Sequence, residues 1–157
     1  MSTSLNLVLY RTKDGKLIEE DLKTVRCEEI SGSLLEKIKS EFPMIERQVY
    51  FDDSLTESFD IDCFSVSDTD GVCKLLEDMF LELLRFENNR LNSEQADSSA
   101  LQGKSTKLAA DIHSDENQSS PIELAVVRFR ILTGIIGIFT EARNKFSDDI
   151  GIVIKLG

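Results

Sequence analysis

The sequence predicts an α+β fold in which a mainly antiparallel sheet is packed by two long helices and completed by a C-terminal strand. Three observations favour it. Segments with strand character fill most of the first 66 residues and are separated by turn signals. Two later stretches, 69–90 and 121–146, repeat their apolar residues with helical spacing. The last segment, 150–156, is nearly continuous Ile and Val, which is typical of a strand buried on both faces.

The N-terminal segment is predicted to form a β-hairpin. Residues 5–11 are the first strand, and the pair Asp14-Gly15 supplies the backbone freedom that a tight turn requires. The return strand spans 16–28. It carries an acidic centre at 19–21, where we expect a bend or a break because acidic residues disfavour a regular strand.

A short helix and two further strands follow. The motif Ser33-Leu34-Leu35-Glu36 has the spacing of a capping box, so a helix is predicted over 33–41, and Pro43 ends it. The segments 48–52 and 57–66 are predicted strands. In the second strand apolar residues alternate with acidic ones, so one of its faces should lie in water.

The two long helices carry most of the apolar periodicity. Helical spacing through 69–90 connects seven apolar residues: Val72, Leu75, Leu76, Met79, Phe80, Leu83 and Phe86. The motif Ser120-Pro121-Ile122-Glu123 combines a capping Ser, a first-position Pro and a third-position Glu, so the second helix should span 121–146. The Ile-rich stretch 131–139 leaves a strand as the alternative there.

The segment between these helices is predicted to be a flexible insertion. Residues 91–120 contain seven Ser and no aromatic residue, so they cannot bury enough apolar surface to offset the entropy of ordering. We therefore expect a single domain, with 1–90 its first part, 91–120 the flexible acidic and Ser-rich insertion, and 121–157 completing it.

The predicted order is β-β-α-β-β-α, the insertion, and then α-β. Its first four strands and short helix resemble a ubiquitin-like roll, and its sheet with flanking helices resembles a longin- or profilin-like sandwich equally well. Both resemblances imply an open sheet packed by helices.

The charge of the chain argues against direct binding of nucleic acid. The formal net charge is −11, whereas affinity for phosphate backbones comes largely from Lys and Arg. The middle third holds most of the excess, since residues 51–100 carry 13 acidic and 3 basic residues. This acidic region is either a solvated face or a docking surface for a basic partner.

The cysteines and the apolar segments indicate a reducing compartment. Cys27, Cys63 and Cys73 are odd in number and show no CxxC spacing, so neither a disulfide framework nor a zinc site is expected. The N-terminal segment lacks the charged start and long apolar region of a signal peptide. The apolar stretch 131–140 is about half the length that crosses a bilayer, so we expect no membrane span and a cytoplasmic or nuclear location.

The motifs of common catalytic and cofactor sites are missing from the sequence. The only histidine, His113, falls in the predicted flexible segment, which is a poor place for the base of a nucleophilic triad. Neither GxxxxGK[ST] nor GxGxxG occurs, so no phosphate-binding loop is expected. An enzyme that uses only carboxylates as general acid and base is a further hypothesis, because such residues can be distant in the sequence and meet only in the fold.

Two acidic patterns suggest metal sites but fit them poorly. The segment 66–77 matches several positions of a calcium-binding loop, yet Val66 stands where the first carboxylate is needed. Asp60-Ile61-Asp62 has DxD spacing, but both side chains of a strand at that spacing share one solvent face. We therefore expect no metal and no cofactor.

The sequence thus favours a non-catalytic protein-interaction module, a small adaptor or a subunit of a complex, that forms homo- or hetero-oligomers. The residues expected to contact a protein partner are apolar ones of the last helix and acids of the strand region: Ile131, Ile135, Ile138, Phe139, Asp52, Asp53, Asp60 and Asp62. The alternative is an acidic mimic or inhibitor that binds a basic, nucleic-acid-binding protein surface. Binding of that kind would collapse with salt, whereas an apolar interface would barely respond.

Overall fold

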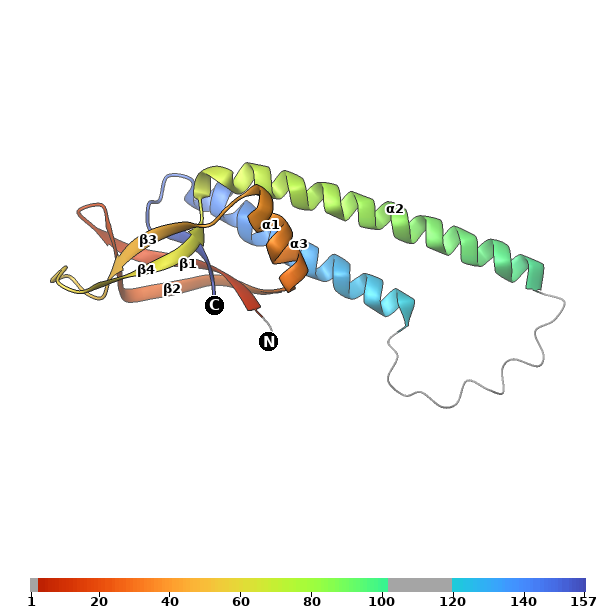
Figure 1. Cartoon of the computed structure of the whole chain (residues 1–157), viewed down its shortest axis with the longest axis horizontal. Coiled ribbons are helices and arrows are strands. Elements are labelled where there is room, and N and C mark those ends of the chain that lie inside the picture. Colours follow the sequence, from red (N-terminus) through yellow and green to blue (C-terminus); the bar gives the residue numbers. More distant parts are fainter. Residues whose placement is uncertain (1–2, 102–119) are drawn as a thin grey trace, which may run out of the picture. The chain divides into compact units, whose positions relative to one another are not determined.

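The computed structural model describes residues 3–101 and 120–157 (Figure 1). Nine elements follow one another in this part of the chain: β1 (Thr3–Lys13), β2 (Lys16–Ile30), α1 (Gly32–Glu41), β3 (Ile45–Tyr50), β4 (Ser58–Phe64), the 3₁₀ turn η1 (Val66–Asp68), α2 (Thr69–Leu101), α3 (Pro121–Phe146) and β5 (Ile152–Leu156). They form two compact units, which we call the barrel unit (Met1–Glu77 and Ile131–Gly157) and the helical unit (Asp78–Arg130).

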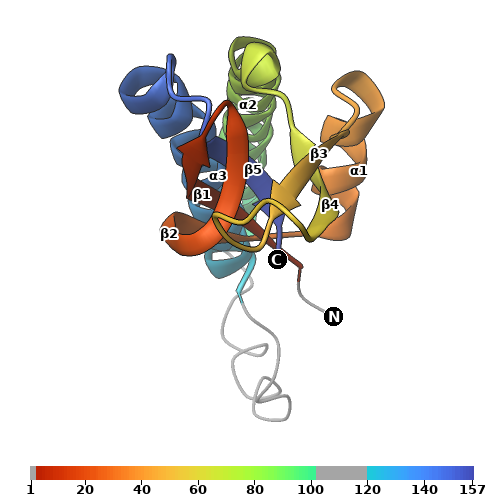
Figure 2. The same ribbon diagram turned by 90° about the vertical axis from the view of Figure 1, so that its left-hand side faces the viewer.

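The five strands close into a mixed barrel in the order β1-β2-β3-β4-β5, so the prediction of an open antiparallel sheet, as a ubiquitin-like roll or a longin- or profilin-like sandwich packed by two long helices, is wrong. Four of the neighbouring pairs are antiparallel. The fifth pair, β2 with β3, is parallel and closes the barrel through two residue pairs, Leu17 with Val49 and Ile18 with Tyr50. Figure 2 shows β5 between the β1–β2 pair and the β3–β4 pair.

A bend in β2 makes this closure possible. Asp21 has a positive φ of 68°, and the register of β1 against β2 shifts at this point, between Leu9 and Arg11 of β1. The bend falls within the acidic centre 19–21, where the sequence predicts it. Such an irregularity sharpens the local twist, which turns the first part of β2 toward β3.

The barrel has an apolar interior. Val8, Tyr10, Leu17, Val49, Cys63 and Val153 form its buried cluster. Neighbouring residues of β5 lie on the opposite face of that strand, where Ile152 and Ile154 are also fully buried. The prediction of a C-terminal strand buried on both faces is therefore confirmed.

The helix starts follow local sequence signals. Ser31, two residues before the predicted Ser33, caps α1 by accepting a hydrogen bond from the Leu34 amide at 3.3 Å. The predicted capping box of α3 is present with both bonds, Ser120 N to Glu123 Oε2 at 2.7 Å and Glu123 N to Ser120 Oγ at 3.2 Å. The helix spans Pro121–Phe146 as predicted, which rules out the strand alternative.

The end of α2 differs from the prediction. The helix continues to Leu101, eleven residues beyond position 90, so the first part of the predicted insertion 91–120 is helical. Arg90 bridges Glu87 and Glu94, at 2.8 and 2.6 Å, and such pairs at helical spacing stabilise a helix that lacks large apolar residues. The remainder of the predicted insertion, up to residue 119, lies outside the described residues.

Candidate functional site

The predicted apolar partner residues on α3 lie in the barrel unit. Ile135, Ile138 and Phe139 are fully buried, and the Phe139 ring meets Phe64 of β4 edge-on with centroids 5.7 Å apart. Ile131, at the start of this segment, is half-buried. The three buried side chains therefore belong to the core and offer no surface to another protein.

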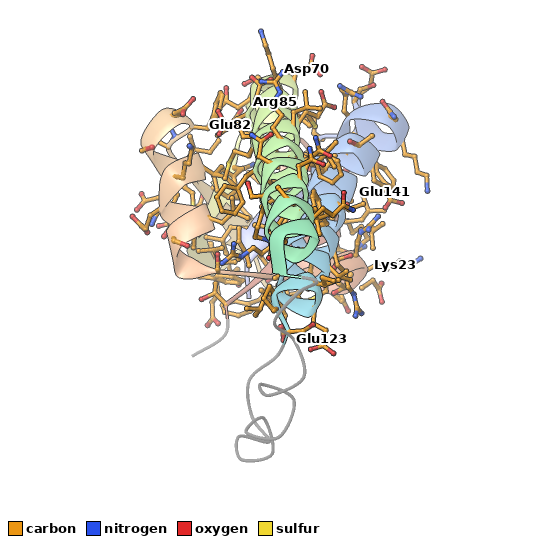
Figure 3. The ribbon with its side chains drawn as sticks, turned by 90° about the vertical axis from the view of Figure 1, so that its right-hand side faces the viewer. Lys23, Asp70, Glu82, Arg85, Glu123 and Glu141 are labelled. Atoms are coloured by element: carbon orange, nitrogen blue, oxygen red, sulfur yellow. The ribbon has the colours of Figure 1, made fainter. Side chains whose placement is uncertain are left out.

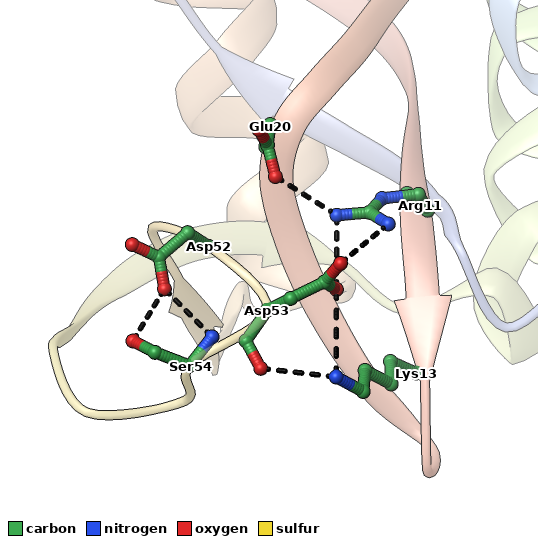
Figure 4. A network of polar contacts seen from close by, with 6 residues as sticks. All are labelled: Arg11, Lys13, Glu20, Asp52, Asp53 and Ser54. Carbon is green, nitrogen blue, oxygen red and sulfur yellow. Dashed lines mark hydrogen bonds and ion pairs between the residues drawn. The ribbon is translucent and has the colours of Figure 1, made fainter.

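Asp52 and Asp53 lie in the exposed loop between β3 and β4, where both already have partners (Figure 4). The Asp53 carboxylate pairs with Arg11 at 2.9 Å, and Lys13 donates to its main-chain oxygen at 3.0 Å. Asp52 accepts hydrogen bonds from the Ser54 hydroxyl and amide, which hold the pKa of Asp52 below its usual value. This loop is a locally satisfied polar network.

Asp60 and Asp62 lie on the exposed face of β4, as the alternation predicts. The register places Asp62 opposite Glu46 and Asp60 opposite Gln48 of β3, so three carboxylates share this face. No ion pair joins them to a Lys or Arg within residues 3–101 and 120–157. The carboxylates of this outer stripe, Glu46, Asp60 and Asp62, are therefore available to a basic partner.

The helical unit exposes many apolar side chains, which the barrel unit does not. Eight of the eleven exposed large hydrophobic residues described belong to it: Leu81, Leu84, Phe86, Leu91, Ile122, Leu124, Val126 and Val127. Isolated exposed apolar residues are ordinary, whereas a concentration of them on two helical segments is typical of surfaces that another molecule covers.

Helical geometry sorts these side chains into faces. Within the unit, α2 and α3 run side by side in opposite directions (Figure 1). Phe80 of α2 meets Phe129 of α3 with ring centroids 5.0 Å apart. Successive residues are about 100° apart around the axis of a helix. Viewed along the axis of α2, Leu84, Leu91 and Leu81 therefore lie roughly 40°, 20° and 100° away from Phe80. Ile122 and Val126 lie about 20° and 60° from Phe129.

Because the two segments are antiparallel, these rotations bring both sets of side chains to one side of the helix pair. We call this surface the lateral face: Leu81, Leu84, Leu91, Ile122 and Val126. Val127 lies a further 100° or so around α3 and points away from it. Exposed charged side chains of the same unit, Glu82, Arg85 and Glu123, are labelled in Figure 3.

The comparisons with known proteins give no match. No protein-family model, no curated protein and no solved structure matches this chain. The lateral face must therefore be interpreted from its own chemistry.

Two open grooves lie on the barrel unit. One, of about 320 Å³, lies between Ile45 and Ile150, and the Arg47 guanidinium there donates to the Ile150 carbonyl at 2.9 Å. The other, of about 350 Å³, is bordered by Lys23 and Asp149. Each mixes one or two cations with acids and apolar walls, and in the first groove the hydroxyls of Ser65 and Ser67 are hydrogen-bonded to each other at 2.7 Å.

The two buried thiols of the described part of the chain are weak nucleophiles. Burial raises the pKa of the Cys63 and Cys73 thiols, so both stay protonated at neutral pH. His113 lies outside the described residues. Among those residues, no three His, Cys, Asp or Glu side chains converge as a metal site would require, and no helix has the length and apolar content to cross a membrane.

The lateral face was not predicted because the partner contacts of α3 were assigned to its later residues, Ile131 to Phe139, and a single apolar stripe was identified on α2. A signal was present: Ile122, Leu124, Val126 and Val127 fall within six residues and surround α3. On α2, the exposed residues Leu81, Leu84 and Leu91 lie outside the apolar stripe that the helical spacing predicted. A helix with apolar residues on several sides needs more than one packing partner.

Proposed function

We propose that this chain is a non-catalytic protein-interaction module, an adaptor or a subunit of a complex, whose contact surface is the lateral face of the helical unit. The observation that carries the proposal is the exposure of five large apolar side chains on one side of two adjacent helices. Covering such a surface removes apolar area from water, the main favourable term in most protein association.

The cysteines support an intracellular location for this module. All three are free, with Cys27 exposed and Cys63 and Cys73 buried, and free thiols persist in reducing compartments. A cytoplasmic or nuclear location is therefore part of this proposal. A net charge of −11 favours protein partners over nucleic acid.

An affinity capture experiment from a lysate of the source cells tests the proposal. The tagged chain is compared with Val126→Glu, which places a charge on the lateral face, and with the matched control Val127→Glu, which places it elsewhere on the same helix. We expect the wild type and the control to retain the same protein in about 1 M salt, where charge interactions are screened, and Val126→Glu to lose it.

Equal retention by all three forms, or no retention by the wild type, would contradict the proposal.

The outer stripe of Glu46, Asp60 and Asp62 favours a second candidate function, an acidic mimic that binds a basic protein surface. That function predicts a partner retained by Val126→Glu at about 0.1 M salt and released from every form at about 1 M.

A further inference from the structure

We propose that the occupant of the lateral face is a second copy of this chain, so that the helical units of two copies pack as an antiparallel four-helix bundle. This inference rests on the proposed function and names its partner. It is carried by three features of the face: its charges, the register between its helices, and the charge balance of the unit.

The charges of α3 are self-complementary. Glu123 and Arg130 are seven residues apart on the same side of the helix, close to the lateral face, with Val126 between them. An antiparallel copy related by a two-fold axis near Val126 brings each Glu123 opposite the other copy's Arg130. Arg130 forms no ion pair within the described residues, so it is available for this contact.

The same two-fold axis also brings apolar residues of α2 opposite each other. The Phe80–Phe129 contact sets the two helices level at these residues, so a point between residues 126 and 127 of α3 is level with one between 82 and 83 of α2. A two-fold axis at this level, perpendicular to the helices, brings Leu81 of one copy opposite Leu84 of the other. One symmetry operation thus pairs apolar with apolar on α2 and acid with base on α3, as an isologous interface requires.

Both helices contribute to a short interface. The two-fold axis brings residues 78–87 of α2 and 123–130 of α3 opposite the same segments of the second copy, about 15 Å and about 12 Å of helix. A stable interface of standard size buries about 800 Å² on each partner, so this shorter contact should give a dimer that dissociates at micromolar concentrations.

The charge balance of the unit permits self-association. Its described residues, 78–101 and 120–130, carry six acidic and four basic residues, a net charge of −2. The barrel unit carries 20 acidic and 12 basic residues, a net charge of −8. Two copies therefore repel each other least when they meet through their helical units.

Sedimentation velocity from about 1 to about 100 μM tests the inference on the purified full chain, because a modest interface dissociates in this range. We expect a monomer–dimer equilibrium for the wild type and an unchanged one for Val127→Glu. Val126→Glu should raise the dissociation constant about a hundredfold, since it buries two carboxylates at the centre of the interface. Circular dichroism confirms that each variant is folded.

Charge reversal identifies the partner as a second copy. Arg130→Glu and Glu123→Arg should each weaken the homodimer about tenfold, because like charges then meet at two symmetric positions. An equimolar mixture of the two variants restores both attractive pairs and should dimerise as tightly as the wild type. Glu123→Gln, which keeps the capping box and removes only the charge, controls for damage to the start of α3.

A wild-type chain that stays monomeric, equal weakening by Val126→Glu and Val127→Glu, or a mixture that associates no better than its components would overturn the inference. These results leave the proposed function to its own capture experiment, in which a different protein would be retained through Val126. Failure of both experiments would overturn both proposals.

Discussion

The barrel unit buries most of its large apolar side chains, whereas the helical unit exposes many of its own. Of the 25 hydrophobic residues described as buried, 24 belong to the barrel unit, and only Ala125 belongs to the helical unit. The exposed large hydrophobic residues show the reverse distribution. The barrel unit therefore supplies its own core, whereas the helical unit leaves apolar surface uncovered that another protein could bury.

This difference arises within continuous helices. The same α3 carries Ile138, fully buried in the barrel unit, and Ile122, 60% exposed in the helical unit. Composition alone therefore does not decide whether an apolar helix residue stabilises the fold or contacts a partner. What decides it is whether another element of the chain covers that side of the helix.

The largest expected effect is a difference in stability between variants of these two isoleucines. Ile138→Ala should lower the free energy of unfolding by about 2–5 kcal/mol, because it leaves a cavity in the barrel core. Ile122→Ala should change it by no more than about 0.5 kcal/mol at concentrations where the chain is monomeric. Urea denaturation measures both. Similar losses for the two variants would show that the helical unit is packed as tightly as the barrel.

A second prediction tests the close approach of β1 to the start of β5. A Cβ atom at Gly151 would clash with the main-chain oxygen of Tyr10, so the backbone must shift to admit it. Gly151→Ala should therefore lower the free energy of unfolding by about 1–3 kcal/mol. Gly32→Ala, where nothing lies within 4 Å, is the control. A fully stable Gly151→Ala variant in thermal denaturation would contradict this packing.

A third prediction compares the two helix caps. Ser31→Ala should cost about 1 kcal/mol in global stability, because α1 packs three buried side chains in the barrel unit. Ser120→Ala should accelerate hydrogen exchange in the first turn of α3 and leave the global unfolding transition in place, since the helical unit can open locally. Native-state hydrogen exchange distinguishes the two. A global loss from Ser120→Ala would indicate that both units unfold together.

The smallest effect concerns the pH dependence of the β3–β4 loop. The hydrogen bonds from Ser54 lower the pKa of Asp52, so their contribution to stability is present above the unfolded-state pKa of about 3.9 and is lost as the pH falls through the folded value. Ser54→Ala should raise the pKa of Asp52 toward its usual value, as measured by NMR titration of its carboxyl carbon. An unchanged pKa would mean that the amide of residue 54 suffices.

Most elements follow from the sequence because their signals are local. The capping box at Ser120 sets the start of α3, and the acidic cluster around Asp21 marks the bend in β2. The continuous Ile and Val of β5 predict its burial on both faces. Each of these features depends on a few neighbouring residues.

Neither the closure of the barrel nor the lateral face can be predicted from local sequence signals. Closure depends on two parallel residue pairs between Leu17-Ile18 and Val49-Tyr50, which are distant in sequence and carry no local signal of pairing. Ile135, Ile138 and Phe139 were assigned to a partner surface because the sequence does not show that the barrel unit buries them. The acidic residues Asp60 and Asp62 are exposed as predicted, because strand alternation is local.

The most direct test of this account is hydrogen–deuterium exchange measured over a hundredfold range of protein concentration. We expect protection in the strands of the barrel unit to be independent of concentration, because that unit is complete by itself. Protection in 78–87 of α2 and 123–130 of α3 should rise with concentration as a second copy covers the lateral face. Protection of the helical segments that is the same at every concentration would contradict the account.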